Sequence, residues 1–391
     1  MFETFLRRSE HLAEVQAQRA VLRFVNGVEW LIRDPKDVVG RTPYGVVYRR
    51  RKLEVRHYRA HARRAPRFDL PVLLVPPLMV KPFIFDLWPG RSLVGFLLDR
   101  GFDVFLVDFG EPDAADAYVT LDDYVLDWIP TACAQVRRVT GSRELSLIGY
   151  CMGGLFCLMY LGVSGDPAVR NLVTLGSPLD VSKMGLFAWA AKMGGGQVEF
   201  LARRIGNVPG GLSSTVFRLL SPARNVTRYA DLFLNLWDRE YVNGFDAVDQ
   251  WISQFIAYPQ GAFLQFVHDF MEHNQLVQGK MRFGGKVADL ARVRANLLAF
   301  AGRTDRIAPA PSVRAQVKAV GSRDVTYALV PGGHIGVLTG STAPKCVWPR
   351  LAAWLATRSA ARSRRPRKGS HGAVARRAKR GSQRARRAGH H

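Results

Sequence analysis

The strongest chemical signal in the sequence lies at residues 149–154, which are Gly-Tyr-Cys-Met-Gly-Gly. This hexapeptide follows an apolar run typical of a buried strand and precedes an apolar run typical of a buried helix. A nucleophile on a sharp strand-to-helix turn needs glycine on both sides, because side chains there would clash with the turn. The pattern therefore predicts a nucleophile elbow with Cys151 at its apex, where serine is more usual. A buried structural cysteine in a glycine-rich turn is the alternative interpretation.

An acid and a histidine follow in the chain order that an elbow nucleophile requires. Asp305 comes after the apolar run 296–300, and His334 comes after the run 324–330. In open α/β sheets, the loops at the carboxyl ends of the strands are where catalytic residues gather. We therefore predict that His334 is the general base for Cys151, because an imidazole titrates near neutrality. Asp305 would orient that imidazole or serve an incoming hydroxyl nucleophile.

Backbone N–H groups near the elbow are candidates for an oxyanion hole, which holds the charge that forms on an attacked carbonyl. The N–H of Met152 lies just after the nucleophile, at the start of the predicted helix. A second donor is expected around Leu78 and Met79, in the proline-rich stretch 75–82 after the first core strand. A thiolate attacks thioesters readily and forms a covalent acyl-enzyme. These residues together predict acyl transfer through Cys151.

Alternating strands and helices must position these residues. Predicted strands cover 71–75, 103–107, 145–148, 171–175, 296–300 and 324–330, and predicted helices cover 92–101, 121–139, 312–320 and 344–356. Apolar strands separated by helices predict a mostly parallel sheet covered on both faces, which is an α/β fold. Residues 41–59 add two strands of alternating pattern joined by a basic turn.

Five segments are predicted along the chain. They are an amphipathic helical segment at 1–40, the two parts of the core at 41–181 and 291–357, a cap or lid insertion at 182–290, and a disordered basic tail at 358–391. Aromatic residues in the insertion are interpreted mainly as its own core, with an apolar acyl channel and dimer surface as the alternative. They are Trp237, Trp251, Phe255, Tyr258, Phe263, Phe266 and Phe270.

Composition and charge exclude several classes of protein. The formal net charge is +24, and 13 basic residues with no acidic residue fall in 358–391, so nonspecific binding of nucleic acid or anionic surfaces is a hypothesis for this tail. Four cysteines are too few for a disulfide scaffold and indicate a reducing compartment. The uncharged run 145–163 is long enough to span a membrane, but glycines interrupt it. With no signal-peptide pattern either, we expect a cytoplasmic protein without a transmembrane segment.

Neither a metal site nor a bound cofactor is expected. His268 and His273 are five residues apart, which is not the i, i+4 spacing that places two ligands on one helix face. A phosphate-binding glycine loop with Lys-Ser/Thr is absent from the sequence.

Several stretches together resemble the polyhydroxyalkanoate synthase family. The resemblance covers about residues 35 to 356. It rests on Val-Gly-Arg-Thr-Pro at 39–43, Val-Val-Tyr-Arg at 46–49, Val-Pro-Pro-Leu at 75–78, Phe-Asp-Leu at 85–87 with Pro89, Leu-Asp-Asp-Tyr-Val at 121–125, the cysteine box at 149–154, Ala-Gly-Arg-Thr-Asp-Arg-Ile at 301–307 and Gly-Gly-His-Ile at 332–335. The chain departs from residues frequent in the family at Val80 and at Arg306.

The resemblance implies an α/β-hydrolase fold with an inserted helical cap. It implies transfer of 3-hydroxyacyl groups from coenzyme A thioesters to Cys151 and then to the hydroxyl of a growing polyester. In that family the aspartate is held to activate the acceptor hydroxyl, a role that Asp305 would inherit. The length resembles the short synthases that work with a separate partner subunit. A homodimer at the surface of storage granules is the corresponding expectation for assembly and location.

Two other functions stay open on the sequence alone. A thioesterase or esterase would share the elbow, Asp305 and His334, but would pass the acyl group to water. A catalytically silent α/β module would instead act by binding nucleic acid through residues 358–391. Free hydroxyacid among the products would indicate the hydrolase, and an unimpaired Cys151→Ala protein would indicate the silent module.

Overall fold

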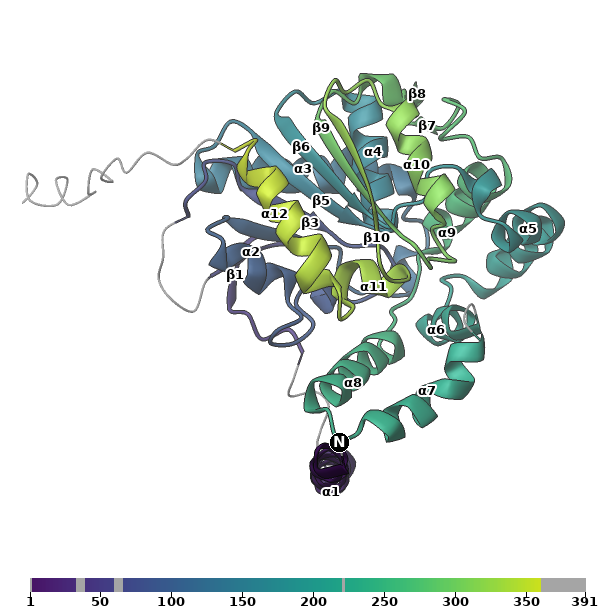
Figure 1. Ribbon diagram of the computed structural model, residues 1–391. Coiled ribbons are helices and arrows are strands. Elements are labelled where there is room, and N and C mark those ends of the chain that lie inside the picture. The colour runs from purple at the N-terminus through teal and green to yellow at the C-terminus, as the bar shows by residue number, and fades with distance from the viewer. Residues whose placement is uncertain (1, 33–38, 60–65, 220–221, 360–391) are drawn as a thin grey trace, which may run out of the picture. The chain divides into compact units, whose positions relative to one another are not determined.

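An eight-stranded sheet forms the centre of the computed structural model, which describes residues 2–32, 39–59, 66–219 and 222–359 (Figure 1). The strand order is β1-β2-β4-β3-β5-β6-β9-β10. The strands are β1 (Tyr44–Arg50), β2 (Leu53–Tyr58), β3 (Val72–Val75), β4 (Val104–Asp108), β5 (Leu145–Tyr150), β6 (Val169–Leu175), β9 (Asn296–Gly302) and β10 (Val325–Val330). β2 pairs antiparallel with β1 and β4, and the other pairs in this sheet are parallel. The predicted α/β class and each predicted strand are confirmed.

Both faces of the sheet are buried under helices, which explains the continuous apolar runs of its strands. In β3, Leu73 and Val75 belong to one hydrophobic cluster, while Val72 and Leu74 belong to the other. The first cluster includes side chains of α3 (Ile129–Thr140) and α4 (Met152–Ser164), and partly buried side chains of α10 (Ala310–Ala319) pack against it. The second includes side chains of α2 (Leu93–Asp99), α11 (His334–Thr339) and α12 (Trp348–Ala356), which lie over one face in Figure 1.

Two predicted helices begin with an irregular turn. The predicted helix 121–139 starts as a π-helical segment, Asp123–Trp128, and becomes α-helical only in α3. Pro130 lies in the first turn of α3, and because proline has no N–H it cannot complete the i→i−4 bond at that point. The same arrangement recurs at Ala343–Val347, which precedes α12 and its Pro349. Wider π-type turns are a common way for a helix to accommodate such an interruption.

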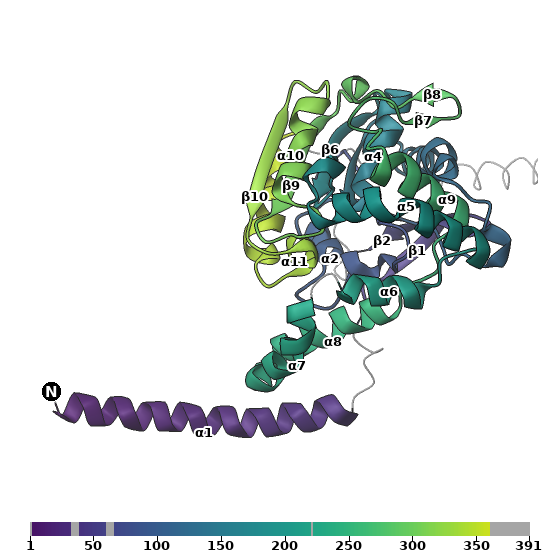
Figure 2. The ribbon, with the colours of Figure 1, turned by 90° about the vertical axis from the view of Figure 1, so that its right-hand side faces the viewer.

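The chain between β6 and β9 leaves the sheet and is mainly helical; it is called the insertion below. Its helices are α5 (Leu186–Ile205), α6 (Gly210–Leu219), α7 (Pro222–Asn235), α8 (Arg239–Ser253), α9 (Gln260–Gln265) and the π-helix Phe266–Glu272, followed by the short hairpin of β7 (Arg282–Phe283) and β8 (Lys286–Val287). Figure 2 shows α6, α7 and α8 grouped together, in agreement with their mutual contacts. That this insertion serves as a lid, with bounds 182–290, stays a prediction.

The terminal segments differ in how much of them is described. A long helix, α1 (Phe2–Ile32), occupies most of the predicted segment 1–40. Within the described ranges, no helix combines the length and apolarity that crossing a membrane would require. The predicted basic tail, with its proposed nucleic-acid binding, lies outside the described residues from residue 360 onward.

Candidate active site

Cys151 sits at the junction of β5 and α4 in a strained backbone conformation. Its φ and ψ angles are 52° and −120°, a region that costs a non-glycine residue roughly 1–3 kcal/mol. A Cβ on Gly149 would lie 2.4 Å from the Cα of Gly154, and one on Gly153 would lie 2.1 Å from the carbonyl oxygen of Val75. These distances confirm the prediction that the elbow requires glycine on both sides. The half-buried cysteine is therefore held at the carboxyl end of a central strand.

A buried carboxylate holds the imidazole of His334. Asp305 Oδ2 accepts a hydrogen bond from His334 Nδ1 at 2.8 Å, and the two side chains are 0% and 8% exposed. Asp305 Oδ1 accepts from the backbone N–H groups of Ile307 and Ala308 at 2.9 and 2.8 Å. Because Nδ1 donates to the carboxylate, Nε2 is the ring nitrogen that remains for the thiol. The acid and the histidine that the sequence singled out, 29 positions apart, are thus direct partners.

The charges around His334 favour its protonated form. Burial alone would lower the pKa of the imidazole, but electrostatic attraction to Cys151 and to Asp305, together with the hydrogen bond to the Asp305 carboxylate, raises the pKa of His334 to about 10. The ring therefore lies close enough to the cysteine for the charges of the two groups to interact. A protonated imidazole stabilises a thiolate that forms beside it, and the thiolate is the nucleophilic form of a cysteine.

The predicted oxyanion donors lie beside the elbow. Met152 is the first residue of α4, so its N–H has no partner within the helix. The loop after β3 begins next to the elbow. The carbonyl oxygens of Val75 and Pro76 lie so close to Gly153 that a side chain at this position would collide with them. Leu78 is buried in the same hydrophobic cluster as Met152, against which Met79 and Cys151 also pack. The loop is therefore adjacent to the nucleophile.

Met79 gives this loop an unusual shape. Its φ angle is 60°, in the left-handed region, which a residue with a side chain seldom occupies. Such a conformation persists only where surrounding contacts determine it. The residue type does not indicate this geometry, because methionine is not a residue that favours a positive φ angle.

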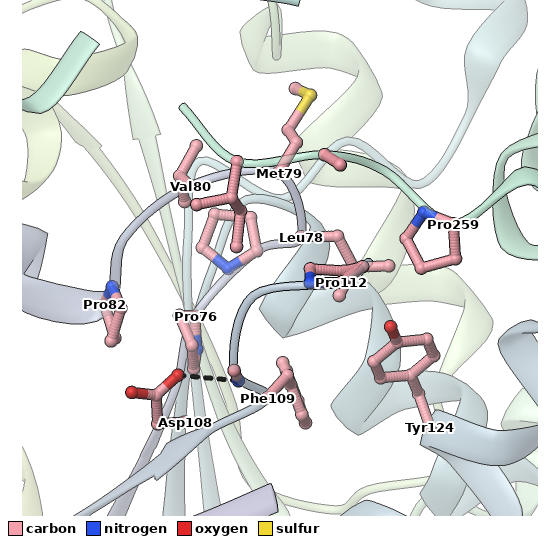
Figure 3. Close-up of a pocket in the computed structure, with 14 residues that line it drawn as sticks. Pro76, Leu78, Met79, Val80, Pro82, Asp108, Phe109, Pro112, Tyr124 and Pro259 are labelled. Carbon is pink, nitrogen blue, oxygen red and sulfur yellow. Dashed lines mark hydrogen bonds between the residues drawn. The ribbon is translucent and has the colours of Figure 1, made fainter. Parts of the chain in front are cut away.

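A narrow pocket separates this loop from the insertion (Figure 3). Its lining includes Leu78 and Met79 of the loop and Ile256, Ala257 and Pro259 of the insertion. Its volume is about 10 Å³, roughly the space that one water molecule needs. Among the described residues, its lining does not include the elbow cysteine. A ligand larger than a water molecule could enter here only after one wall of the pocket moves.

Three site residues were not identified from the sequence. Gly176, after β6, has a φ angle of 57°, and a Cβ there would lie 3.4 Å from both Asp305 Oδ2 and His334 Nδ1. The Tyr150 hydroxyl donates to the His334 carbonyl at 3.3 Å, and the buried Tyr258 hydroxyl contacts the Met152 sulfur at 3.4 Å. The glycine after a predicted strand was a usable signal. The tyrosine contacts depend on the folded path of the chain.

Comparison with known proteins agrees with this geometry. The family model described as alpha/beta hydrolase fold matches residues 71–341, and the one described as Poly-beta-hydroxybutyrate polymerase (PhaC) N-terminus matches residues 35–97. The chain is 35% identical over 329 residues to the poly(3-hydroxyalkanoate) polymerase subunit PhaC of Haloferax mediterranei, covering 82% of this chain and 65% of that one. It is 32% identical over 332 residues to subunit PhaC of Allochromatium vinosum, covering 84% and 92%. The chain belongs to the PhaC family.

Membership of the PhaC family confirms the resemblance and the α/β-hydrolase fold that the sequence predicted. The chain spans just under two thirds of the Haloferax relative and most of the Allochromatium relative. The two departures of the chain from residues frequent in the PhaC family differ in exposure, since Val80 is buried and Arg306 is exposed. Within the described part of the chain, no group of three or more His, Cys, Asp or Glu residues is placed to hold a metal ion.

Proposed function

We propose that this PhaC-family protein is a polyhydroxyalkanoate synthase that transfers 3-hydroxyacyl groups from coenzyme A thioesters, through Cys151, to a growing polyester. The observation that carries the proposal is the cysteine elbow beside a buried, hydrogen-bonded His334–Asp305 pair, in a chain whose relatives are named poly(3-hydroxyalkanoate) polymerases. No cofactor takes part in this reaction, because the thioester itself supplies an activated acyl group.

The first half of the reaction loads the enzyme. His334 holds the proton that the Cys151 thiol gives up, and the sulfur forms a bond to the thioester carbonyl carbon. The N–H of Met152, with an N–H from Leu78 or Met79, stabilises the oxyanion of the tetrahedral intermediate. The carbon–sulfur bond to coenzyme A then breaks, and the leaving thiolate takes the proton from the imidazolium. The product is an acyl thioester on the cysteine.

The second half transfers the acyl group to the polymer. His334 accepts the proton of the acceptor hydroxyl, whose oxygen attacks the acyl carbon on Cys151. The cysteine leaves as the thiolate beside the imidazolium, which restores the resting pair. We assign Asp305 to orienting the imidazole rather than to contacting the acceptor hydroxyl. Its side chain is fully buried and both of its oxygens already accept hydrogen bonds, which supports this assignment.

Assembly and location are part of the proposal. The insertion exposes large apolar side chains on three helices: Val198, Phe200, Leu201 and Ile205 of α5, Leu212, Val216 and Leu219 of α6, and Tyr229, Phe233 and Leu234 of α7. Apolar surface of this kind supports a homodimer, a separate synthase subunit, or contact with the polyester at the surface of a storage granule. Light scattering of the purified protein at several concentrations, and sedimentation with polyester granules, would test these expectations.

Product analysis tests the proposed reaction. Purified protein incubated with a short 3-hydroxyacyl-CoA should release free coenzyme A and form an oligomer or polymer of the hydroxyacid. Cys151→Ala should release no coenzyme A. Circular dichroism is the control and should show that this variant keeps the wild-type fold. Free hydroxyacid as the sole product would instead indicate a thioesterase. If no coenzyme A were released by the protein alone or with candidate partner subunits, the proposal would be wrong.

A further inference from the structure

Two hydrogen bonds join the insertion to the loop that carries the predicted oxyanion donors. The backbone N–H of Ile256 donates to the carbonyl oxygen of Met79 at 2.9 Å. The indole N–H of Trp251 donates to the carbonyl oxygen of Lys81, also at 2.9 Å. Trp251 lies in the last turn of α8, and Ile256 follows the end of that helix. One short segment of the insertion therefore holds two peptide groups of the loop.

The anchor for these bonds is rigid. Trp251 is 2% exposed, and its ring packs edge-on against Phe255 and Phe217, with ring centroids 5.1 and 6.3 Å apart. Phe217 belongs to α6 and Trp251 to α8, so two helices of the insertion fix the indole. An indole N–H held in this way has little freedom to choose another acceptor.

The fixed peptide groups determine the direction of the predicted oxyanion donor. The carbonyl of Met79 belongs to the peptide group that follows this residue, and the N–H of Met79 belongs to the one before it. The two groups are related by the φ and ψ angles of Met79, whose φ of 60° needs support from neighbouring contacts. Holding the following carbonyl on Ile256, and the Lys81 carbonyl on Trp251, supplies that support.

We infer that Trp251 is a positioning residue that aligns the oxyanion loop, so that the insertion controls transition-state stabilisation as well as access to the site. The inference rests on the proposed acyl transfer. When the insertion stays against the loop, the donors of Leu78 and Met79 remain directed at the elbow. When the insertion moves to admit an acyl chain, both hydrogen bonds break, and the oxyanion hole re-forms only on closure. Trp251 itself touches no reacting atom.

The test separates oxyanion stabilisation from activation of the thiol. Acylation of Cys151 by a hydroxyacyl-CoA develops an oxyanion, whereas alkylation of the same sulfur by iodoacetamide does not. Trp251→Phe keeps an aromatic ring but removes the N–H. Trp348→Phe is the matched control, because Trp348 is also 2% exposed and its indole N–H donates to a backbone carbonyl, that of Leu338, at 2.8 Å in the core.

We expect Trp251→Phe to lower the single-turnover acylation rate about 10- to 100-fold, less than the loss of a whole oxyanion donor. Its alkylation rate, followed on the Cys151 peptide, should stay within about twofold of wild type. Trp348→Phe should leave the ratio of the two rates unchanged. Phe217→Leu loosens the packing of the indole without removing its N–H, so it should lower the ratio of acylation to alkylation by a smaller factor. This variant replaces Trp251→Phe if the latter does not fold.

Three outcomes would overturn the inference. The first is a ratio of acylation rate to alkylation rate that is equal in Trp251→Phe and Trp348→Phe, which would show that the two hydrogen bonds do not align the loop. If Phe217→Leu replaces Trp251→Phe, its ratio is compared in the same way. A parallel fall of both rates would show an effect on the thiol instead. A wild-type protein that is alkylated but never acylated would remove the proposed function, and the inference with it, whereas the first two outcomes leave acyl transfer intact.

Discussion

Replacing Asp305 by asparagine removes one negative charge from the site at nearly constant size. The aspartate accepts from His334 Nδ1 at 2.8 Å and from two backbone N–H groups in the following loop. The asparagine oxygen can keep the backbone bonds only if its NH₂ group faces the imidazole. An NH₂ group facing Nδ1 cannot accept the ring proton, so the imidazole must change tautomer or turn away from Cys151.

The expected magnitude follows from the charges on the imidazole. A pKa of His334 raised from 6.5 to about 10 corresponds to roughly 5 kcal/mol in favour of the imidazolium, shared between Cys151 and Asp305. Removing the carboxylate charge should lower that pKa by about 1–3 units, the effect of one opposite charge at this range. The acylation rate should fall roughly 10²- to 10⁴-fold, as it does when a catalytic histidine loses its orienting acid.

Two measurements check this prediction. The ring nitrogens of His334 can be followed by NMR from pH 6 to pH 11 in the wild type and in Asp305→Asn, and single-turnover release of coenzyme A gives the rate. The reasoning is refuted if the variant keeps more than about a tenth of the wild-type rate, or if its His334 still titrates at the wild-type pH. Cys151→Ala is the control for the share of the pKa rise that comes from the sulfur.

The same raised pKa predicts a pH dependence of stability. Because His334 binds its proton more tightly when folded, its contribution is fully present below pH 6.5 and is lost as the pH rises through about 10. Asp305→Asn should therefore lower the free energy of unfolding more at pH 6 than at pH 10.5, as measured by urea denaturation. An equal loss at both pH values would contradict this assignment of charge.

Two further predictions concern packing and cysteine chemistry. Gly176→Ala should reduce acylation about tenfold and stability by roughly 1–2 kcal/mol, because alanine disfavours a φ of 57° and the backbone adjustment would displace the carboxylate–imidazole pair that its methyl group contacts; unchanged kinetics and urea midpoint would contradict this. Iodoacetamide should modify Cys151 and the exposed Cys346 in the native protein but not Cys133 and Cys157, since burial raises the pKa of the Cys133 thiol to about 12 and that of Cys157 well above its usual range. Peptide mapping after a short exposure checks the second prediction, and early labelling at either buried cysteine would contradict it.

The sheet and the chain order of the site residues could be predicted from the sequence because both leave local patterns. Buried parallel strands are continuous apolar runs, and the elbow needs glycines at fixed offsets from Cys151. Asp305 and His334 were found because each follows such a run. A loop is the prediction for His334 from its place after a strand, whereas the structure has it as the first residue of the short helix α11. Gly332 and Gly333 precede His334, and a pair of glycines is more typical of a loop than of the start of a helix.

The features that escaped prediction depend on contacts between distant parts of the chain. The indole of Trp251 was interpreted as part of the core of the insertion, and its burial agrees, but its hydrogen bond reaches a loop 170 positions away. The positive φ of Met79 has no signature in its own residue type. Gly176 has no side chain to suggest chemistry, and its importance comes from its positive φ angle next to the acid and the histidine.

Intact-mass spectrometry of the protein after brief exposure to a short 3-hydroxyacyl-CoA tests the central claim most directly. The account predicts a mass increase of one hydroxyacyl group, mapped to the peptide that contains Cys151 and absent from Cys151→Ala. In Asp305→Asn the same adduct should appear more slowly. An adduct on another residue, or wild-type protein that consumes the thioester while Cys151 stays unmodified, would contradict it.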